Sequence, residues 1–232
     1  MKRWSILWND LLNLFFPKTC LTCSKPLLEN EEQICLECLC DLPYTNFHKK
    51  KENRIGQLFI WNMSVEKATA FLYYEKGGHV QKLIHQLKYH DNPEIGHLLG
   101  RIAALKIQKE STFFEGIDTL LPVPLHPKRQ RARGYNQAAV IASGIQEITH
   151  LPIETSAVIR QIGNESQTHK QFYERSENVS AIFRIMNPEP LQGKHLLIID
   201  DVITTGSTIS SLCQTLSEIP DIKISIFSLS AV

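Results

Sequence analysis

Residues 196–208 read LLIIDDVITTGST, and this stretch decides the fold of the chain. Its first half is an apolar run that predicts a buried strand, and the run ends in two aspartates, Asp200 and Asp201. A short loop of hydroxyl-bearing residues with one glycine follows and leads into a helix-like segment. Ligands of open α/β sheets bind beyond the carboxyl ends of the strands, so the sequence predicts a ligand site at this loop.

The residue types in this loop predict a phosphate site beside a sugar site. Backbone N–H groups at a helix N-terminus favour a phosphate, and Gly206 lets the backbone approach it closely. The two aspartates can accept hydrogen bonds from vicinal ribose hydroxyls and can hold a sugar-bound Mg²⁺. Alternatively the aspartates merely cap a helix, but one aspartate suffices for that, and the hydroxyl-rich loop then has no explanation. The predicted ligand-binding residues are Asp200, Asp201, Thr204, Thr205, Gly206, Ser207 and Thr208.

The segments around this stretch alternate between strand-like and helix-like patterns. Such alternation is typical of parallel βαβ units, so the predicted fold class is α/β, a parallel sheet flanked by helices. The predicted domains are residues 1–62 and residues 63–232. We expect strands at 68–74, 119–123, 154–160, 181–186, 195–199 and 222–229, and helices at 80–87, 95–109, 136–148 and 208–216.

Five of the six cysteines lie between residues 20 and 40, in a pattern typical of a metal site. Two CxxC pairs, Cys20 with Cys23 and Cys35 with Cys38, predict two tight turns that aim four sulfurs at one Zn²⁺. Four protein ligands leave no position for water, so the predicted role of the zinc is structural. Cys40 could take the place of Cys38, although the paired spacing favours Cys38. The alternatives are reduced thiols without metal or a redox CxxC.

A second predicted anion site follows the strand at 119–123. Three prolines stiffen the loop after this strand, and four cations then fall within residues 128–133. A solvated basic loop is the alternative, which we would prefer if the segment stood alone. The candidate residues are Pro122, Val123, Pro124, Leu125, Lys128, Arg129, Arg131 and Arg133.

Charge and hydropathy indicate a cytoplasmic protein. The formal net charge is +1, so attraction to nucleic acid or membrane must come from a local patch. Apolar residues between Trp4 and Phe15 recur at helical spacing and predict an amphipathic helix that packs on the protein, with weak membrane association as the alternative. Polar residues interrupt this run, which is unlike a secretory leader, and no stretch reaches the length of a transmembrane helix.

The stretch at 196–208 matches the phosphoribosyl-pyrophosphate (PRPP) motif of type I phosphoribosyltransferases. Together with the cysteines it resembles the ComF family, the ComFC-like proteins of bacterial competence. The resemblance implies a type I phosphoribosyltransferase fold behind a double zinc ribbon-like module, and PRPP bound with Mg²⁺. It also implies that 121–133 is the pyrophosphate loop. The matching segments are LLNLFFPKTCLTC at 11–23, LIHQLKYH at 83–90 and LPVPLHPKRQRARGYNQ at 121–137.

The family's mobile loop resembles residues 160–183, where Arg160, Gln167, Arg175, Asn178 and Phe183 match. The sequence departs from the family at 164–166 and at Lys170, which puts the closing chemistry and substrate choice of this loop in doubt. The segment is polar and contains Gly163, so we expect a lid.

Three functions are compatible with these features. The ComF resemblance implies a DNA-uptake accessory that contacts single-stranded DNA or a helicase partner, and Trp61, Tyr73, Tyr74 and Tyr135 could stack on bases. The second is an enzyme in which a nitrogen nucleophile displaces pyrophosphate from PRPP, although the sequence reveals no general base. The third is a non-catalytic sensor of PRPP or nucleotides.

Overall fold

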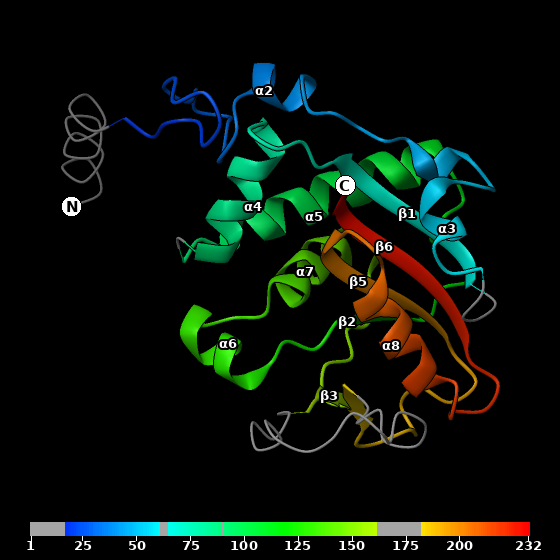
Figure 1. Ribbon diagram of the computed structural model, residues 1–232. Coiled ribbons are helices and arrows are strands. Elements are labelled where there is room, and N and C mark those ends of the chain that lie inside the picture. The colour runs from blue at the N-terminus through cyan, green and yellow to red at the C-terminus, as the bar shows by residue number, and fades with distance from the viewer. Residues whose placement is uncertain (1–16, 61–64, 90, 162–181) are drawn as a thin grey trace, which may run out of the picture.

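The computed structural model describes residues 17–60, 65–89, 91–161 and 182–232 (Figure 1). The amphipathic helix expected before Phe15 lies outside these residues. Within them, no helix combines the length and apolar character needed to cross a bilayer.

A four-stranded parallel sheet forms the centre of the protein. Its order is β1–β6–β5–β2, so β5 and β6 are paired on both sides. Strands buried in this way are mostly apolar on both faces, and β5 accordingly reads LLII between His195 and its aspartates, whereas β6 also carries the buried Ser225, Ser228 and Ser230. The strands are β1 (Val65–Tyr73), β2 (Thr119–Pro122), β5 (His195–Ile203) and β6 (Lys223–Ala231).

Helices cover both faces of this sheet (Figure 1). Leu197 and Ile199 of β5 pack into the hydrophobic cluster that holds α4, α5 and α7, whereas Leu196 and Ile198 pack with α8 on the other face. This alternation follows from the two-residue period of a strand. The predicted α/β class, a parallel sheet flanked by helices, is confirmed. These helices are α4 (His79–Tyr89), α5 (Pro93–Glu110), α7 (Gln137–Thr149) and α8 (Ser207–Leu216).

Two glycines bring α5 and α7 into backbone contact. A Cβ atom on Gly100 would lie 2.2 Å from the Ile141 carbonyl oxygen, and one on Gly144 would lie 2.0 Å from the His97 carbonyl oxygen. Only glycine fits at both positions. The close packing fixes α7, and α7 in turn holds the segment that follows β2 at the edge of the sheet.

A separate antiparallel pair replaces two of the strands expected in the main sheet. β3 (Val158–Arg160) pairs with β4 (Phe183–Ile185), and Arg160 lies opposite Phe183 in the register. The strand expected at 154–160 is thus reduced to its last three residues. Upstream, Ile153 makes a single parallel bridge to Leu120.

The cysteine-containing segment packs against the same core. Cys20, Cys35 and Cys38 belong to the hydrophobic cluster that includes α4 and α5. Residues 43–45 run along β1, where Thr45 N–H donates to the Phe71 carbonyl at 3.1 Å. The division at residues 62 and 63 stays a prediction. The short helices here are α2 (Leu36–Cys40), the 3₁₀ turn η1 (Phe47–Lys49) and α3 (Arg54–Gln57).

Candidate functional site

A hollow of about 170 Å³ lies at the carboxyl end of β5. Asp200 and Asp201 are half-buried at its floor. Residues at the carboxyl ends of β2 and β3 also line this hollow. A short helix between β2 and α7 contributes further lining residues. Its lining is Lys88, Val123, Pro124, Leu125, Arg129, Arg133, Asn136, Gln137, Ala138, Arg160, Asp200, Asp201, Val202 and Thr208.

The two aspartates differ in their electrostatic surroundings. Lys88 Nζ lies 2.9 Å from Asp201 Oδ2, and both side chains are largely shielded from solvent. Burial, and to a smaller extent the charge of Asp201, raise the pKa of Asp200 from 3.8 to about 7. The Asp201 amide, which donates to Asp200 Oδ1 at 2.9 Å, and the charges of Lys88 and Arg160 act in the opposite direction. Near neutral pH the two aspartates and Lys88 together therefore carry little net charge.

The loop after the aspartates forms the N-terminus of α8. Gly206 is the N-cap with φ of 76°, and a Cβ atom there would lie 2.9 Å from the Phe59 ring. Glycine is thus required by both backbone angle and space. Thr205 Oγ1 accepts a hydrogen bond from the Ser207 amide at 3.4 Å and lies 3.2 Å from Ser207 Oγ. Gly206 supplies no side-chain cap, so the first amides of α8 other than that of Ser207 can receive an anion.

The segment after β2 joins this site through one backbone hydrogen bond and one bond from a side-chain amide. Val123 N–H donates to the Ile199 carbonyl at 2.9 Å, and Asn136 Nδ2 donates to the Val123 carbonyl at 3.0 Å. The Asn136 Oδ1 also caps α7 by accepting from the Ala138 amide. Pro124 and Leu125 of the predicted anion site line the hollow.

The four predicted cations lie on a helix and not in a loop. α6 (Pro127–Arg133) begins at Pro127 because the His126 side chain caps it, and it ends at Gly134, whose φ is 78°. Arg129 and Arg133, one helical turn apart, line the hollow. Lys128 and Arg131 are exposed and do not line it.

Two basic residues that were not assigned to the site contribute to it. Lys88 reaches the acid pair from α4, and Arg160 reaches it from the end of β3. The Arg160 guanidinium also lies 5.5 Å from the Phe183 ring centroid, and burial lowers its pKa, with the neighbouring Arg129 adding to the effect. Two features of the sequence pointed to these residues: Lys88 belongs to the LKY segment, and Arg160 is the first residue of the expected lid. The rest of that lid, residues 162–181, lies outside the described residues.

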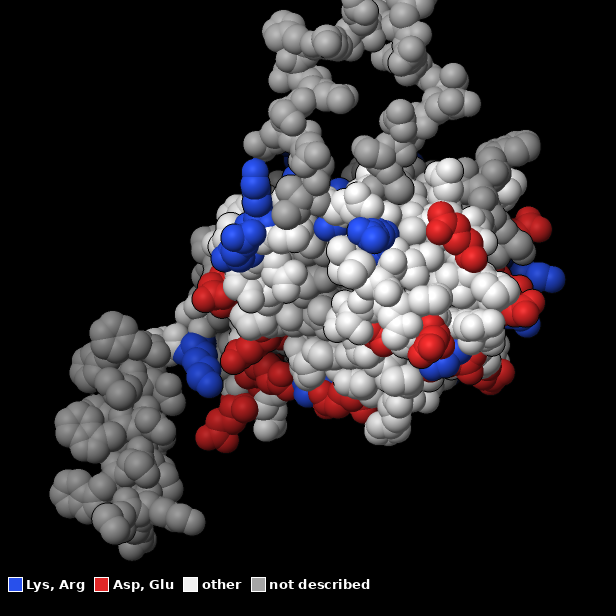
Figure 2. All heavy atoms as spheres, turned by 90° about the horizontal axis from the view of Figure 1, so that it is seen from below, with Lys and Arg blue, Asp and Glu red and all other residues white. Residues whose placement is uncertain are grey.

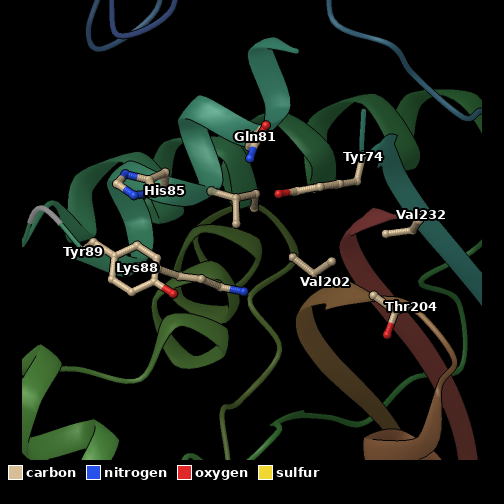
Figure 3. A pocket seen from close by; sticks show the side chains of 9 residues that line it. Tyr74, Gln81, His85, Lys88, Tyr89, Val202, Thr204 and Val232 are labelled. Atoms are coloured by element: carbon tan, nitrogen blue, oxygen red, sulfur yellow. The ribbon is translucent and has the colours of Figure 1, made fainter. Parts of the chain in front are cut away.

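A second and larger hollow of about 550 Å³ borders the first. Figure 3 shows its side chains, which come from α4, from the ends of β1 and β5, and from Val232. Lys88 and Val202 line both hollows. Thr204 faces this larger hollow, whereas Thr208 faces the smaller one, so the predicted phosphate loop lies between them.

The four cysteines of the two CxxC pairs converge. The sulfurs of Cys20, Cys23, Cys35 and Cys38 all lie within 4.8 Å of one another, and those of Cys23 and Cys35 are 3.8 Å apart. A tetrahedral Zn²⁺ with bonds of about 2.3 Å places its sulfurs roughly 3.8 Å apart, so the donor set fits zinc. Cys40 is exposed and outside the cluster, in agreement with the preference for Cys38.

The other cysteine and three of the predicted stacking aromatics serve different purposes. Burial on α8 raises the pKa of Cys213 to about 12, which makes it an inert thiol. Tyr73 packs on the Phe47 ring, with centroids 5.6 Å apart, and the Tyr135 hydroxyl donates to the Leu87 carbonyl at 2.6 Å. Tyr74 lines the larger hollow. Trp61 lies outside the described residues.

The face of the molecule drawn in Figure 2 carries both signs of charge, with Lys and Arg beside Asp and Glu among mostly uncharged residues. This agrees with a formal net charge of +1. An electrostatic attraction to a polyanion must therefore come from a local group of cations.

Comparison with known proteins relates the chain to two groups of named relatives. The DNA utilization protein YhgH of Escherichia coli K12 is 29% identical over 217 residues, which cover 88% of this chain and 92% of YhgH. The competence protein ComFC of Bacillus subtilis is 26% identical over 205 residues, which cover 87% and 78% of the two chains. The chain is a homologue of the ComF and YhgH proteins. The resemblance stated from the sequence is thereby confirmed, although no protein-family model matches.

Solved structures align less closely. A hypothetical protein of Neisseria gonorrhoeae with bound ppGpp gives a TM-score of 0.37 at 16% identity, covering 60% of this chain and 68% of that one. A hypoxanthine phosphoribosyltransferase of Trypanosoma cruzi gives 0.36 at 13% identity, covering 60% and 78%. At such TM-scores neither alignment carries an argument about this chain, and the site must be judged on its own geometry.

Replacing Asp200 by asparagine is expected to stabilise the folded protein at alkaline pH. Because the pKa of Asp200 rises from 3.8 to about 7 on folding, the folded state keeps a proton that the unfolded state has already lost. Stability therefore falls as pH rises toward and through 7. Asp200→Asn should exceed the wild type by about 1–3 kcal/mol at pH 8 and match it near pH 4, measured by urea unfolding.

A second variant, Lys88→Met, tests whether the lysine charge lowers the pKa of Asp200. Without the lysine charge, the pKa of Asp200 should rise further, and stability should fall more steeply with pH than in the wild type. Equal pH dependence of the wild type and Asp200→Asn would contradict this account of the acid pair.

Proposed function

We propose that this chain binds a phosphoribosyl ligand, PRPP in complex with Mg²⁺, in the smaller hollow. The supporting observation is that an acid pair, three arginines and the N-terminus of α8 meet at one hollow. Carboxylates suit ribose hydroxyls and a hard cation, whereas guanidinium groups and helix N-termini suit phosphate oxygens.

Each part of the ligand has a place in this arrangement. The 5′-phosphate would lie at the amides and hydroxyls of residues 204–208. The ribose hydroxyls would face Asp200 and Asp201. The pyrophosphate would lie against Arg129, Arg133 and Arg160, which line the hollow from α6 and β3. The Mg²⁺ of the ligand would neutralise charge between the carboxylates and the phosphates.

We further infer that this pocket serves a protein that acts in DNA uptake or use. The support is homology over most of the chain to proteins named for competence and DNA utilization. Lys128 and Arg131 are exposed on α6 and do not line the hollow, so they can contact the backbone of single-stranded DNA. Docking on a helicase partner remains a prediction.

Phosphoribosyl transfer is a second candidate function, supported by the pKa of Asp200. A nitrogen nucleophile would attack the anomeric carbon, and the bond from that carbon to the pyrophosphate oxygen would break with its electron pair leaving on pyrophosphate. The proton lost by the nitrogen would pass to the Asp200 carboxylate. A pKa of about 7 suits such a proton acceptor at neutral pH. Binding without turnover would instead indicate a sensor of PRPP or nucleotides.

The cysteine cluster is proposed to hold one structural Zn²⁺. Three of its four thiols are buried, and the cluster packs against the core that contains α4. The ion would therefore hold residues 20–38 against the core next to α4, the helix that carries Lys88.

Isothermal titration with Mg-PRPP tests the proposed ligand. The wild type should bind, and Asp200→Asn with Asp201→Asn should weaken binding by about tenfold or more, because the ribose and cation contacts are lost. Glu218→Gln with Asp221→Asn changes the net charge equally at two exposed positions and should leave binding unchanged. Absence of binding by the wild type would refute the proposal.

Cys38→Ser and Cys40→Ser test the metal site as a matched pair. Elemental analysis of purified protein should find one zinc per chain in the wild type and in Cys40→Ser, and much less in Cys38→Ser. The unfolding temperature should fall only in Cys38→Ser, because the ion is expected to stabilise the folded segment. Retention of zinc by Cys38→Ser would show that Cys40 or another group replaces it.

The two sides of α6 provide matched variants for the DNA proposal. Lys128→Ala with Arg131→Ala should weaken the binding of oligo(dT) and reduce the slope of log K against log salt by about 1.4, measured by fluorescence anisotropy. Arg129→Ala with Arg133→Ala removes the same charge, yet should impair Mg-PRPP binding instead. Identical effects of both pairs on DNA would exclude a specific DNA face on this helix.

A further inference from the structure

A further hollow lies at the amino end of β1, at the opposite end of the parallel sheet from the acid pair. Its space of about 530 Å³ is within the usual range of ligand pockets, about 300–1,000 Å³. In Figure 1, α3 lies beside this end of the sheet and α6 lies beyond the other. We call it the lysine hollow, and its described lining residues are His48, Lys49, Lys50, Lys51, Glu66, Lys67, Ala68, Glu110, Ser111, Thr112 and Phe113.

Positive charge predominates in the lysine hollow. Four lysines line it against two glutamates, Glu66 and Glu110, which leaves an excess of two positive charges. Burial lowers the pKa of His48, so its imidazole adds no charge at neutral pH. The formal net charge of the whole chain is only +1, so this excess is a local concentration of charge. Such a group of cations is what attraction to an anionic ligand requires.

Two of the four lysines are held in place by the protein. Lys67 Nζ donates to three backbone carbonyls in the turn that follows α5, at 3.1, 3.1 and 2.7 Å, which uses all three of its protons. Lys49 Nζ lies 3.0 Å from Glu110 Oε2. These two lysines therefore contribute positive charge at fixed positions, and Lys67 has no proton left to donate to a ligand.

The other two lysines, Lys50 and Lys51, have uncommitted donors. Both are exposed, and neither ammonium group has a hydrogen bond or an ion pair within the part of the chain that the structure describes. Each ammonium group carries three protons that can be donated to oxygen. The exposed Thr112 hydroxyl lines the same hollow. An anion in this hollow would thus meet two mobile donors, with the fixed charges of the other lysines beside them.

His48 has a buried ring nitrogen without a partner. Its side chain is 1% exposed, and its Nε2 lies 2.9 Å from Glu110 Oε2, whereas Nδ1 has no hydrogen-bond partner among the described residues. A buried polar atom in this state costs free energy unless a ligand or water satisfies it. Because a neutral imidazole donates through Nε2 to the carboxylate, Nδ1 is an acceptor. Since His48 lines the lysine hollow, a hydroxyl group of an occupant is well placed to satisfy it.

We propose that the lysine hollow binds a small hydroxylated phosphate monoester, at a site separate from the phosphoribosyl site. The excess of two positive charges matches a monoester, which carries about two negative charges, whereas a diester carries one. Lys50 and Lys51 donate to the phosphate oxygens, and a hydroxyl of the ligand donates to His48 Nδ1. The hollow is larger than a phosphate group requires, which leaves room for the organic part of the ester.

Isothermal titration of the full, zinc-loaded chain with glycerol 3-phosphate at pH 8 tests this site. The wild type should bind, and Lys50→Gln with Lys51→Gln should weaken binding by about tenfold or more, because the donors to the phosphate are lost. Lys18→Gln with Lys76→Gln removes the same charge at two exposed positions outside the hollow and should leave the affinity within about twofold. Absence of binding by the wild type would refute the inference.

Glu66→Gln provides a variant that should gain affinity, which a folding defect cannot imitate. Glu66 is exposed and lines the lysine hollow, so its removal leaves one more uncompensated positive charge. Glycerol 3-phosphate should then bind about two- to fivefold more tightly. Unchanged or weaker binding by Glu66→Gln would contradict a charge-based site.

Two analogues test the chemistry of the ligand. Dimethyl phosphate, a diester, should bind the wild type about tenfold more weakly than glycerol 3-phosphate, because it carries half the charge. Propyl phosphate, which lacks the hydroxyl groups, should bind several-fold more weakly, because His48 Nδ1 then stays unsatisfied. Equal affinity for all three compounds would overturn the assignment to a hydroxylated monoester.

Arg129→Ala with Arg133→Ala separates this site from the phosphoribosyl site. These arginines line the hollow at the acid pair, so the variant should impair Mg-PRPP binding and leave glycerol 3-phosphate binding unchanged. Loss of glycerol 3-phosphate binding here, with retention in Lys50→Gln with Lys51→Gln, would place the compound in the phosphoribosyl site and overturn the inference. Oligo(dT) without a terminal phosphate provides the last comparison. If it bound through Lys50 and Lys51 as tightly as glycerol 3-phosphate, the hollow would recognise a phosphodiester backbone and the inference would fail.

Discussion

The pairing of β5 between β2 and β6 is the constraint on which the rest of this structure depends. A strand bonded on both sides and covered on both faces is mostly apolar, and β5 is buried from His195 to Ile199. The two adjacent carboxylates follow where the pairing of β5 with β2 ends, while β5 still pairs with β6. Their partial burial is costly unless charges and donors surround them. The lysine of α4, the Asp201 amide and the arginine of β3 meet that requirement.

These compensating groups come from distant parts of the chain, and specific contacts hold them in place. The Tyr135 hydroxyl bonds to the carbonyl of Leu87, the residue before Lys88, and so ties the end of α4 to the segment after α6. Asn136 binds the strand end at Val123 while it caps α7. The glycine contact between α5 and α7 fixes the helix that carries this cap. Local helix capping and long-range packing therefore use the same residues to position the site.

The sequence predicted those features that reside in one continuous segment. The strand, acid pair and glycine loop at 196–208 are local, as is the convergence of two CxxC turns, and both could be predicted. The pairing of Lys88 with Asp201 joins residues far apart in sequence, and no local pattern encodes it. Likewise, four cations within 128–133 did not reveal a helix, because the decisive signals were a histidine cap and a terminal glycine. The antiparallel pairing of β3 with β4 depends on the long segment between them, and periodicity carries no information about partners.

The charge of the acid pair limits how a divalent cation can enter this site. With Lys88 on Asp201 and the pKa of Asp200 near 7, the pair offers a cation little net negative charge at neutral pH. A free Mg²⁺ would have to displace Lys88 or a proton to reach these carboxylates. On the function proposed above, a cation already bound to phosphates would bring its own counter-charge, and the arginines would stabilise the remaining anionic oxygens. The proposed function therefore implies that the metal and the phosphoribosyl ligand bind as one complex, and that Lys88 leaves Asp201 when that complex binds.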